Sequence, residues 1–215
     1  MAKHYSWNDD NWLLVMQLFM KEPVGVKPLY CRPLVDLSLE LHLPPQVIQE
    51  RMEQLARLDT PRLERLWHNY SDNPKRLSRA ARLLREMSGF NSAGSFYDGV
   101  DVEETFERDF RPLAEDERLK PVMLTVLLDL YFHLTPITMV EETPEVQETA
   151  KMLHIPTSLV VDVLDIFQHC DPYLNRKDVI LSPLLLPCHQ VWNKYGNGSM
   201  EELHSHAAEL SVYFQ

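Results

Sequence analysis

Apolar residues recur along this chain at the spacing of successive amphipathic helices. Trp12, Val15, Met16 and Phe19 follow the i, i+3, i+4, i+7 spacing that makes one helix face apolar. Prolines and capping residues divide the rest of the chain, since proline suits the first helical turn and Asn, Asp, Ser or Thr suits the position before it. The pattern therefore predicts an all-α protein with helices over residues 11–21, 33–41, 45–58, 61–70, 74–88, 119–133, 144–153, 157–170, 187–195 and 199–212.

The same apolar pattern occurs twice. Residues 12–59 align without a gap with residues 124–171, at a constant offset of 112 positions. Few residues are identical, but the inward positions stay apolar, and His42 aligns with His154. We therefore expect two tandem helical units related by internal duplication.

Residues 89–117 differ in composition from both predicted units. The segment begins with Gly, Ser and Asn and continues with nine carboxylates, Asp98, Asp101, Glu103, Glu104, Glu107, Asp109, Glu115, Asp116 and Glu117. We predict an acidic linker here, with one helical turn near residues 102–110, between a first unit of residues 1–88 and a second unit of residues 118–215. The segment also contains five aromatic residues, so parts of it are expected to fold back onto a unit.

Within each unit, the second and third helices have the spacing of a helix-turn-helix. Ser38 and Ala150 supply the small residue where two helices meet, and His42 and His154 occupy the turn. A left-handed backbone at the turn is costlier for histidine than for glycine. The first unit departs from the pattern at Arg51, where the second unit has an apolar residue.

The order of short helix, turn, longer helix and closing Leu-Asp resembles the small helical domain that precedes the nuclease module in some bacterial HNH endonucleases. Residues 41–45 and 58–61 carry the resemblance, which covers about residues 9–72 and, more weakly, residues 121–195. Here the domain would occur in tandem and without the nuclease module. The resemblance implies association with DNA.

The outward faces of the two third helices carry negative charge. On the first helix the outward residues are Pro45, Gln46, Gln49, Glu50 and Glu53, and on the second they are Thr157, Ser158, Val161, Asp162 and Asp165. Two carboxylates per helix, without an outward arginine, oppose the phosphate attraction on which DNA affinity depends. We therefore predict that these faces contact protein, together with the uncharged residues 179–188, which are expected to form an extended packed segment.

Positive charge gathers instead in residues 57–85, which contain eight Lys or Arg residues and three Asp or Glu residues. Candidate phosphate contacts are Arg62, Arg65, Lys75, Arg76, Arg79 and Arg82. The competing interpretation is a solvated face that pairs with the acidic linker or the second unit. The net charge of −11 favours this second interpretation.

Residue patterns for catalysis are missing from the sequence. It has no Gly-rich phosphate loop, no nucleophile elbow and no His-Glu helical metal motif. His169-Cys170 and Cys188-His189 offer zinc-ligand types, but adjacent helical residues point in different directions, so we expect core cysteines instead. We predict no catalytic, cofactor-binding or metal-binding residues.

The chain start has no apolar stretch after its positive charge, and the most apolar window, residues 121–140, contains Asp129, His133 and Pro136. We therefore expect a cytoplasmic protein without a membrane span. The predicted function is that of a non-catalytic regulatory or adaptor protein that binds a protein partner or self-associates through its helix-turn-helix-like units. The alternative is a DNA-binding transcriptional regulator that contacts phosphates through residues 57–85.

Overall fold

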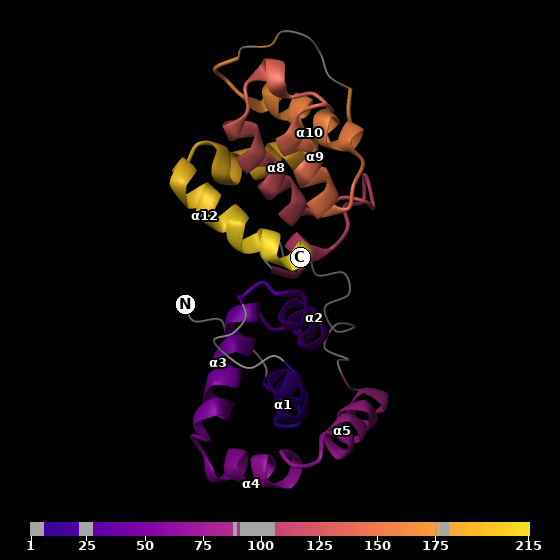
Figure 1. Cartoon of the computed structure of the whole chain (residues 1–215), viewed down its shortest axis with the longest axis vertical. Helices are drawn as coiled ribbons and strands as arrows, with labels where there is room; N and C mark the ends of the chain where they lie inside the picture. The colour runs from indigo at the N-terminus through magenta and orange to yellow at the C-terminus, as the bar shows by residue number, and fades with distance from the viewer. Residues whose placement is uncertain (1–6, 22–27, 88–89, 91–105, 175, 177–180) are drawn as a thin grey trace. The chain divides into compact units, whose positions relative to one another are not determined.

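The computed structural model describes residues 7–21, 28–87, 90, 106–174, 176 and 181–215. The described residues form helices and turns without a strand, which confirms the all-α class. The chain divides into two compact units, residues 1–102 and 103–215 (Figure 1). The second unit thus begins before residue 118, where the sequence predicted it to begin.

The described residues of the first unit form five helices, α1 (Asn11–Lys21), α2 (Arg32–Leu41), α3 (Pro45–Arg57), α4 (Pro61–Tyr70) and α5 (Pro74–Glu86). Helix α1 is central and contacts α2, α3 and α5 (Figure 1). Its residues Leu14, Val15 and Met16 are almost completely buried. The predicted inward face of α3 is confirmed, because Ile48 and Leu55 are fully buried.

The second unit is built around α8 (Pro121–His133), which contacts every other α-helix of the unit. These neighbours are α7 (Phe106–Phe110), α9 (Pro144–Leu153), α10 (Thr157–Cys170), α11 (Leu185–Val191) and α12 (Met200–Ser211). The described part of the unit also has three short turns, the 3-10 turns η1 (Pro136–Thr138) and η3 (Val212–Phe214) and the π-helical turn η2 (Trp192–Gly196). Because α8 is covered on most sides, nine of its residues are buried.

Part of the predicted linker belongs to the second unit. Phe110 of α7 is buried, and its ring centroid lies 5.1 Å from that of Tyr213 near the chain end. This contact confirms that an aromatic residue of the segment folds back onto a unit. The predicted linker residues 89 and 91–105 lie outside the described residues.

Helices α2 and α9 end in the same turn. His42 (φ 55°, ψ 35°) and His154 (φ 58°, ψ 39°) both adopt the left-handed conformation. Leu43 and Ile155, which follow the two histidines, each donate a backbone N–H hydrogen bond of 3.0 Å. The acceptors are the carbonyl oxygens of Ser38 and Ala150, the small residues four positions before the histidines. This is the Schellman motif, which satisfies carbonyl groups at the helix end. The helix order and this turn thus recur in both units, while the internal duplication stays a prediction.

Arg51, the departure from the apolar pattern in α3, is partly buried against aromatic rings. Its guanidinium carbon lies 4.8 Å from the ring centroid of Trp7 and 5.9 Å from that of Trp12. Its Nη1 also donates a hydrogen bond of 2.8 Å to Gln54. The aromatic faces thus stabilise a cation at a position where the second unit buries Val163.

The prediction of an extended packed segment over residues 179–188 is wrong for its second half, since α11 begins at Leu185. Pro187 stands in the first turn of this helix, where a missing backbone N–H breaks no hydrogen bond. Leu181 is 95% exposed, so it is not packed in this unit. Residues 179 and 180 lie outside the described residues.

Among the described residues, none of the helices combines the length and the apolar character that a membrane span requires.

Candidate functional site

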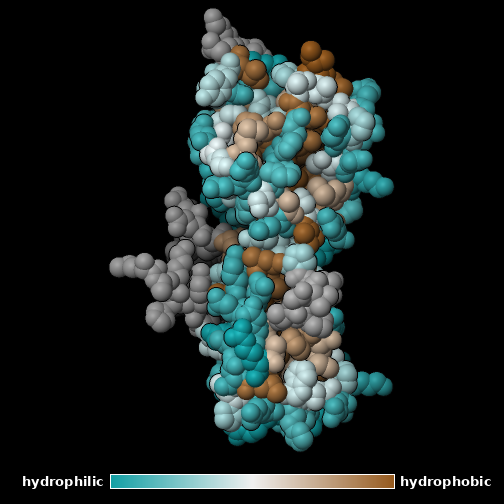
Figure 2. Space-filling view, turned by 60° about the vertical axis from the view of Figure 1, so that its left-hand side comes forward, coloured by the Kyte–Doolittle hydropathy of each residue, from teal (hydrophilic) through white to brown (hydrophobic). Residues whose placement is uncertain are grey.

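The α3 face that the sequence assigned to protein contact lies on the surface of the first unit. Gln46 and Glu50 are exposed, and Gln49 and Glu53 are partly exposed. In Figure 2 the side of the first unit that carries α3 is turned forward, and a band of hydrophilic side chains covers it. Pro45 is the exception: it is buried, because the short turn after α2 holds the start of α3 against that helix.

The α10 face is also outward. Its predicted contact residues are Thr157, Ser158, Val161, Asp162 and Asp165, and none of them is buried. Two of them already have partners, since the Thr157 hydroxyl donates to the Glu141 carboxylate at 2.6 Å and Asp165 accepts from Arg176 at 2.5 Å. Helix α10 itself contains no lysine or arginine, and the charge of the exposed Asp162 is opposed only from outside the helix, by electrostatic interaction with Arg118.

The predicted phosphate-contacting side chains are exposed on α4 and α5. Lys75, Arg79 and Arg82 share one face of α5, opposite its buried residues Leu77, Ala81 and Leu84. Arg76 lies over the ring of Tyr70, with 5.3 Å between guanidinium carbon and ring centroid. Arg65 donates to the carbonyl of Pro61 at 3.2 Å.

Several of these basic residues are neutralised within the first unit. Arg62 pairs with Asp9, and the Nε of Arg82 lies 3.6 Å from Glu86. Arg85 forms a bidentate pair with Glu40 at 2.5 and 2.9 Å, and hydrogen bonding to that carboxylate raises the arginine pKa.

Among the described residues, the partners of Arg62, Arg82 and Arg85 are thus carboxylates of their own unit. Pairing of this region with the acidic linker or the second unit stays a prediction. Lys75 and Arg79 have no ion pair with any carboxylate in the part of the chain that the structure describes. Arg76 has no such ion pair either, since its guanidinium keeps its charge over the ring of Tyr70, so these three cations carry the positive charge of α5 that no described carboxylate neutralises.

The cysteine and histidine pairs do not form a metal centre. Cys188 is completely buried, and burial raises its pKa to about 12, while burial raises the pKa of Cys170 to about 11. His169 contacts Arg176, and His189 is exposed and contacts Asn193. Cys188 is thus a core residue, as predicted, whereas Cys170 is only partly buried.

A different group of side chains meets at the interface of α8 and α12. Within the described residues, the one group of three metal-ligating side chains is Asp129, His133 and His204. The Nδ1 of His204 lies 3.1 Å from one carboxylate oxygen of Asp129 and 3.3 Å from the other. The Nδ1 of His133 lies 3.6 Å from the carboxylate and 2.7 Å from the carbonyl oxygen of Asp129.

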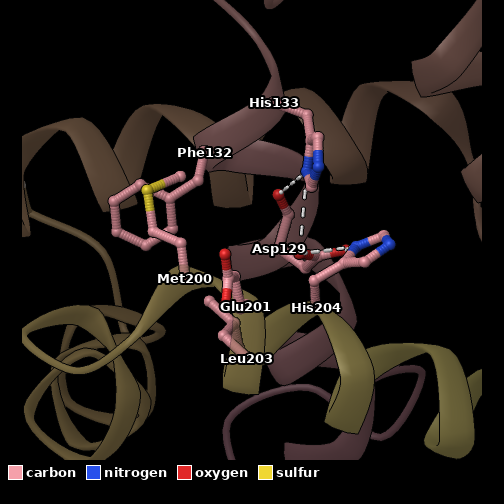
Figure 3. A pocket seen from close by; sticks show the side chains of 7 residues that line it. All are labelled: Asp129, Phe132, His133, Met200, Glu201, Leu203 and His204. Atoms are coloured by element: carbon pink, nitrogen blue, oxygen red, sulfur yellow. Dashed lines mark hydrogen bonds and ion pairs between the residues drawn. The ribbon is translucent and has the colours of Figure 1, made fainter.

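The Asp129 carboxylate lies between the two imidazoles, as Figure 3 shows. Its side chain is 17% exposed, whereas those of His133 and His204 are 53% and 61% exposed. An open pocket of about 220 Å³ adjoins the group, with Phe132, Met200, Glu201 and Leu203 as its other lining residues. The three polar side chains thus line one wall of a largely apolar hollow.

Only part of this group was visible in the sequence. Asp129 and His133 interrupt the apolar α8 at a spacing of four, which places them on one face. His204 is 75 residues from Asp129, and no local pattern links it to α8.

Comparison with protein-family models, with curated proteins and with solved structures gives no match. The resemblance to the helical domain of HNH endonucleases therefore stays a prediction.

Proposed function

We propose that this chain is a non-catalytic regulatory or adaptor protein that binds a protein partner through the outward faces of α3 and α10. The observation that carries the proposal is the negative charge on both faces. Glu50 and Asp162 are exposed at equivalent positions of the two helices, four residues after Gln46 and Ser158.

The arginines of α3 do not offset this charge. Arg51 is directed to the rings of Trp7 and Trp12, and Arg57 lies 3.5 Å from the carboxylate of Glu53. Arg57 is thus neutralised by Glu53, and Arg51 keeps its charge but is partly buried against the two indoles. A duplex would therefore bring its phosphates toward carboxylates, which disfavours groove binding by these helices.

The composition of the faces also suits a protein partner. Exposed amides and hydroxyls, from Gln46, Gln49 and Ser158, offer hydrogen bonds of the kind found at polar interface rims. The carboxylates favour a partner with a basic surface, because complementary charge accelerates association and excludes wrong partners. A second copy of this chain could supply such a surface through its α5 face.

The experiment is quantitative co-purification from the source cells with charge-altered variants. We expect Glu50→Lys and Asp162→Lys to lose a specific partner that the wild-type chain retains. The matched control is Glu148→Lys, an exposed carboxylate of α9 outside the predicted faces. Sedimentation of the purified chain at several concentrations tests self-association. A partner set and sedimentation behaviour that are identical for all variants would contradict the proposal.

The alternative function is a DNA-binding regulator, and the α5 face is the observation that favours it. Lys75 and Arg79 are exposed and have no ion pair with described carboxylates, so they are available to phosphates. This alternative expects an affinity for duplex DNA that falls steeply with salt.

A further inference from the structure

We propose that Asp129, His133 and His204 bind a zinc ion. Imidazole nitrogen and carboxylate oxygen are both common zinc donors, and a set of two histidines and one carboxylate occurs in mononuclear zinc sites. Of the described residues, this group alone brings three such donors within 4.8 Å of one another.

The distances between donor atoms fit a small ion. Zinc bonds of about 2.0–2.1 Å at tetrahedral angles separate neighbouring ligand atoms by about 3.3 Å. The Nδ1 atoms of His204 and His133 lie 3.1 and 3.6 Å from oxygens of Asp129. Coordination through Nδ1 of His133 would replace its contact with the Asp129 carbonyl oxygen.

Packing holds the three donors in place. Helices α8 and α12 form the most extensive helix pair of the unit, and α12 buries Leu203, Ala207 and Leu210. Asp129 and His133 stand one turn apart on α8, and His204 faces them from α12 (Figure 3). The donors therefore lie on rigid helices rather than loops, which lowers the cost of arranging them around an ion.

An ion pair alone does not account for the group. The contact of His204 with Asp129 already links α12 to α8. The ring of His133 also packs against that of His204, with 5.1 Å between centroids, but its Nδ1 faces the carbonyl oxygen of Asp129 on its own helix. A metal ion, in contrast, uses all three side chains.

Three protein ligands leave at least one coordination position for water or another donor. The neighbouring pocket, lined by Phe132, Met200 and Glu201, has space for that donor. The ion would join α8 to α12 and stabilise the second unit.

The test is calorimetric titration of the full chain, without a polyhistidine tag, with zinc chloride. We expect one bound ion for the wild type. His204→Gln, His133→Gln and Asp129→Asn should each weaken binding by more than about 100-fold, since loss of a direct ligand exceeds the 10–100-fold effect of its supporting groups. His189→Gln, which removes another exposed histidine of the same unit, should bind as the wild type does.

Thermal unfolding gives a second readout. Zinc should raise the melting temperature of the wild type and of His189→Gln but not that of His204→Gln, whose fold is checked by circular dichroism without metal. Absence of wild-type binding at millimolar zinc would overturn the proposal. Equal affinity of the wild type and the folded His204→Gln variant would also overturn it.

Discussion

At the scale of single residues, the chain tolerates costly backbone conformations at three helix ends. His42, Leu58 and His154 all have positive φ, where a side chain crowds the backbone. In each case the following residue completes a hydrogen bond to the last helical turn. The turn geometry thus outweighs the local preference of the residue.

Replacing His154 with glycine should stabilise the second unit. Glycine avoids a steric cost of about 1–2 kcal/mol but gains freedom in the unfolded chain, so we expect a net stabilisation of about 0.5–1 kcal/mol. Chemical denaturation measures it. The control His154→Val should destabilise, because a branched side chain suits this conformation poorly. A destabilising glycine variant would show that the imidazole itself makes a stabilising contact.

The thiol of Cys188 should resist alkylation in the folded chain. Its pKa of about 12 means that about one thiol in 10⁴ is ionised at pH 8, and the thiolate is the reactive form. Iodoacetamide labelling followed by mass spectrometry should show protection at pH 8 and rapid reaction in denaturant. The thiol has a higher pKa in the folded chain than in the unfolded chain, where it is about 9. The stability that this difference contributes is therefore present below about pH 9 and is lost as the pH rises toward 12. Fast labelling under native conditions would contradict its burial.

At the scale of elements, the π-helical turn η2 depends on a close approach of backbone and ring. A Cβ added at Gly196 would lie 2.8–3.0 Å from the indole of Trp192. This indole is buried, and its ring centroid lies 5.7 Å from Tyr131 and 5.5 Å from Phe132 of α8. The ring therefore has little room to move.

Gly196→Ala should destabilise the second unit by about 1–3 kcal/mol, the usual cost of overpacking. Gly198→Ala is the matched control, because a Cβ there meets only the carbonyl oxygen of Tyr195 at 3.4 Å. Thermal unfolding of both variants measures the difference. Equal melting temperatures would mean that the indole shifts without cost.

The starts of helices could be predicted from the sequence where an N-cap residue precedes the first turn. Thr60 and Asn73 accept backbone hydrogen bonds at the starts of α4 and α5, each followed by proline, as the sequence predicted. Leu185 and Leu186 were wrongly assigned to an extended segment, because a nearby proline is compatible both with a first helical turn and with an extended segment. The contact between Asp129 and His204 could not be predicted from the sequence, because it depends on how α12 packs against α8.

At the scale of the whole molecule, charge is unevenly distributed along the chain. Residues 1–95 carry 13 Lys or Arg and 11 Asp or Glu residues, whereas residues 96–215 carry 8 and 21. The second part would therefore repel a polyanion at low salt. The arginines of the first unit are partly neutralised by its own carboxylates, Asp9, Glu40 and Glu86.

Fluorescence anisotropy with a random-sequence DNA duplex, titrated from about 50 to 200 mM salt, tests the central claim most directly. If α3 and α10 serve protein contact, the chain should show no measurable duplex affinity even at the lowest salt. Three phosphate contacts, from Lys75, Arg76 and Arg79, would instead give a log–log salt slope of about −2.7. Binding with that slope, and its loss in the Lys75→Ala, Arg79→Ala double variant, would contradict the account.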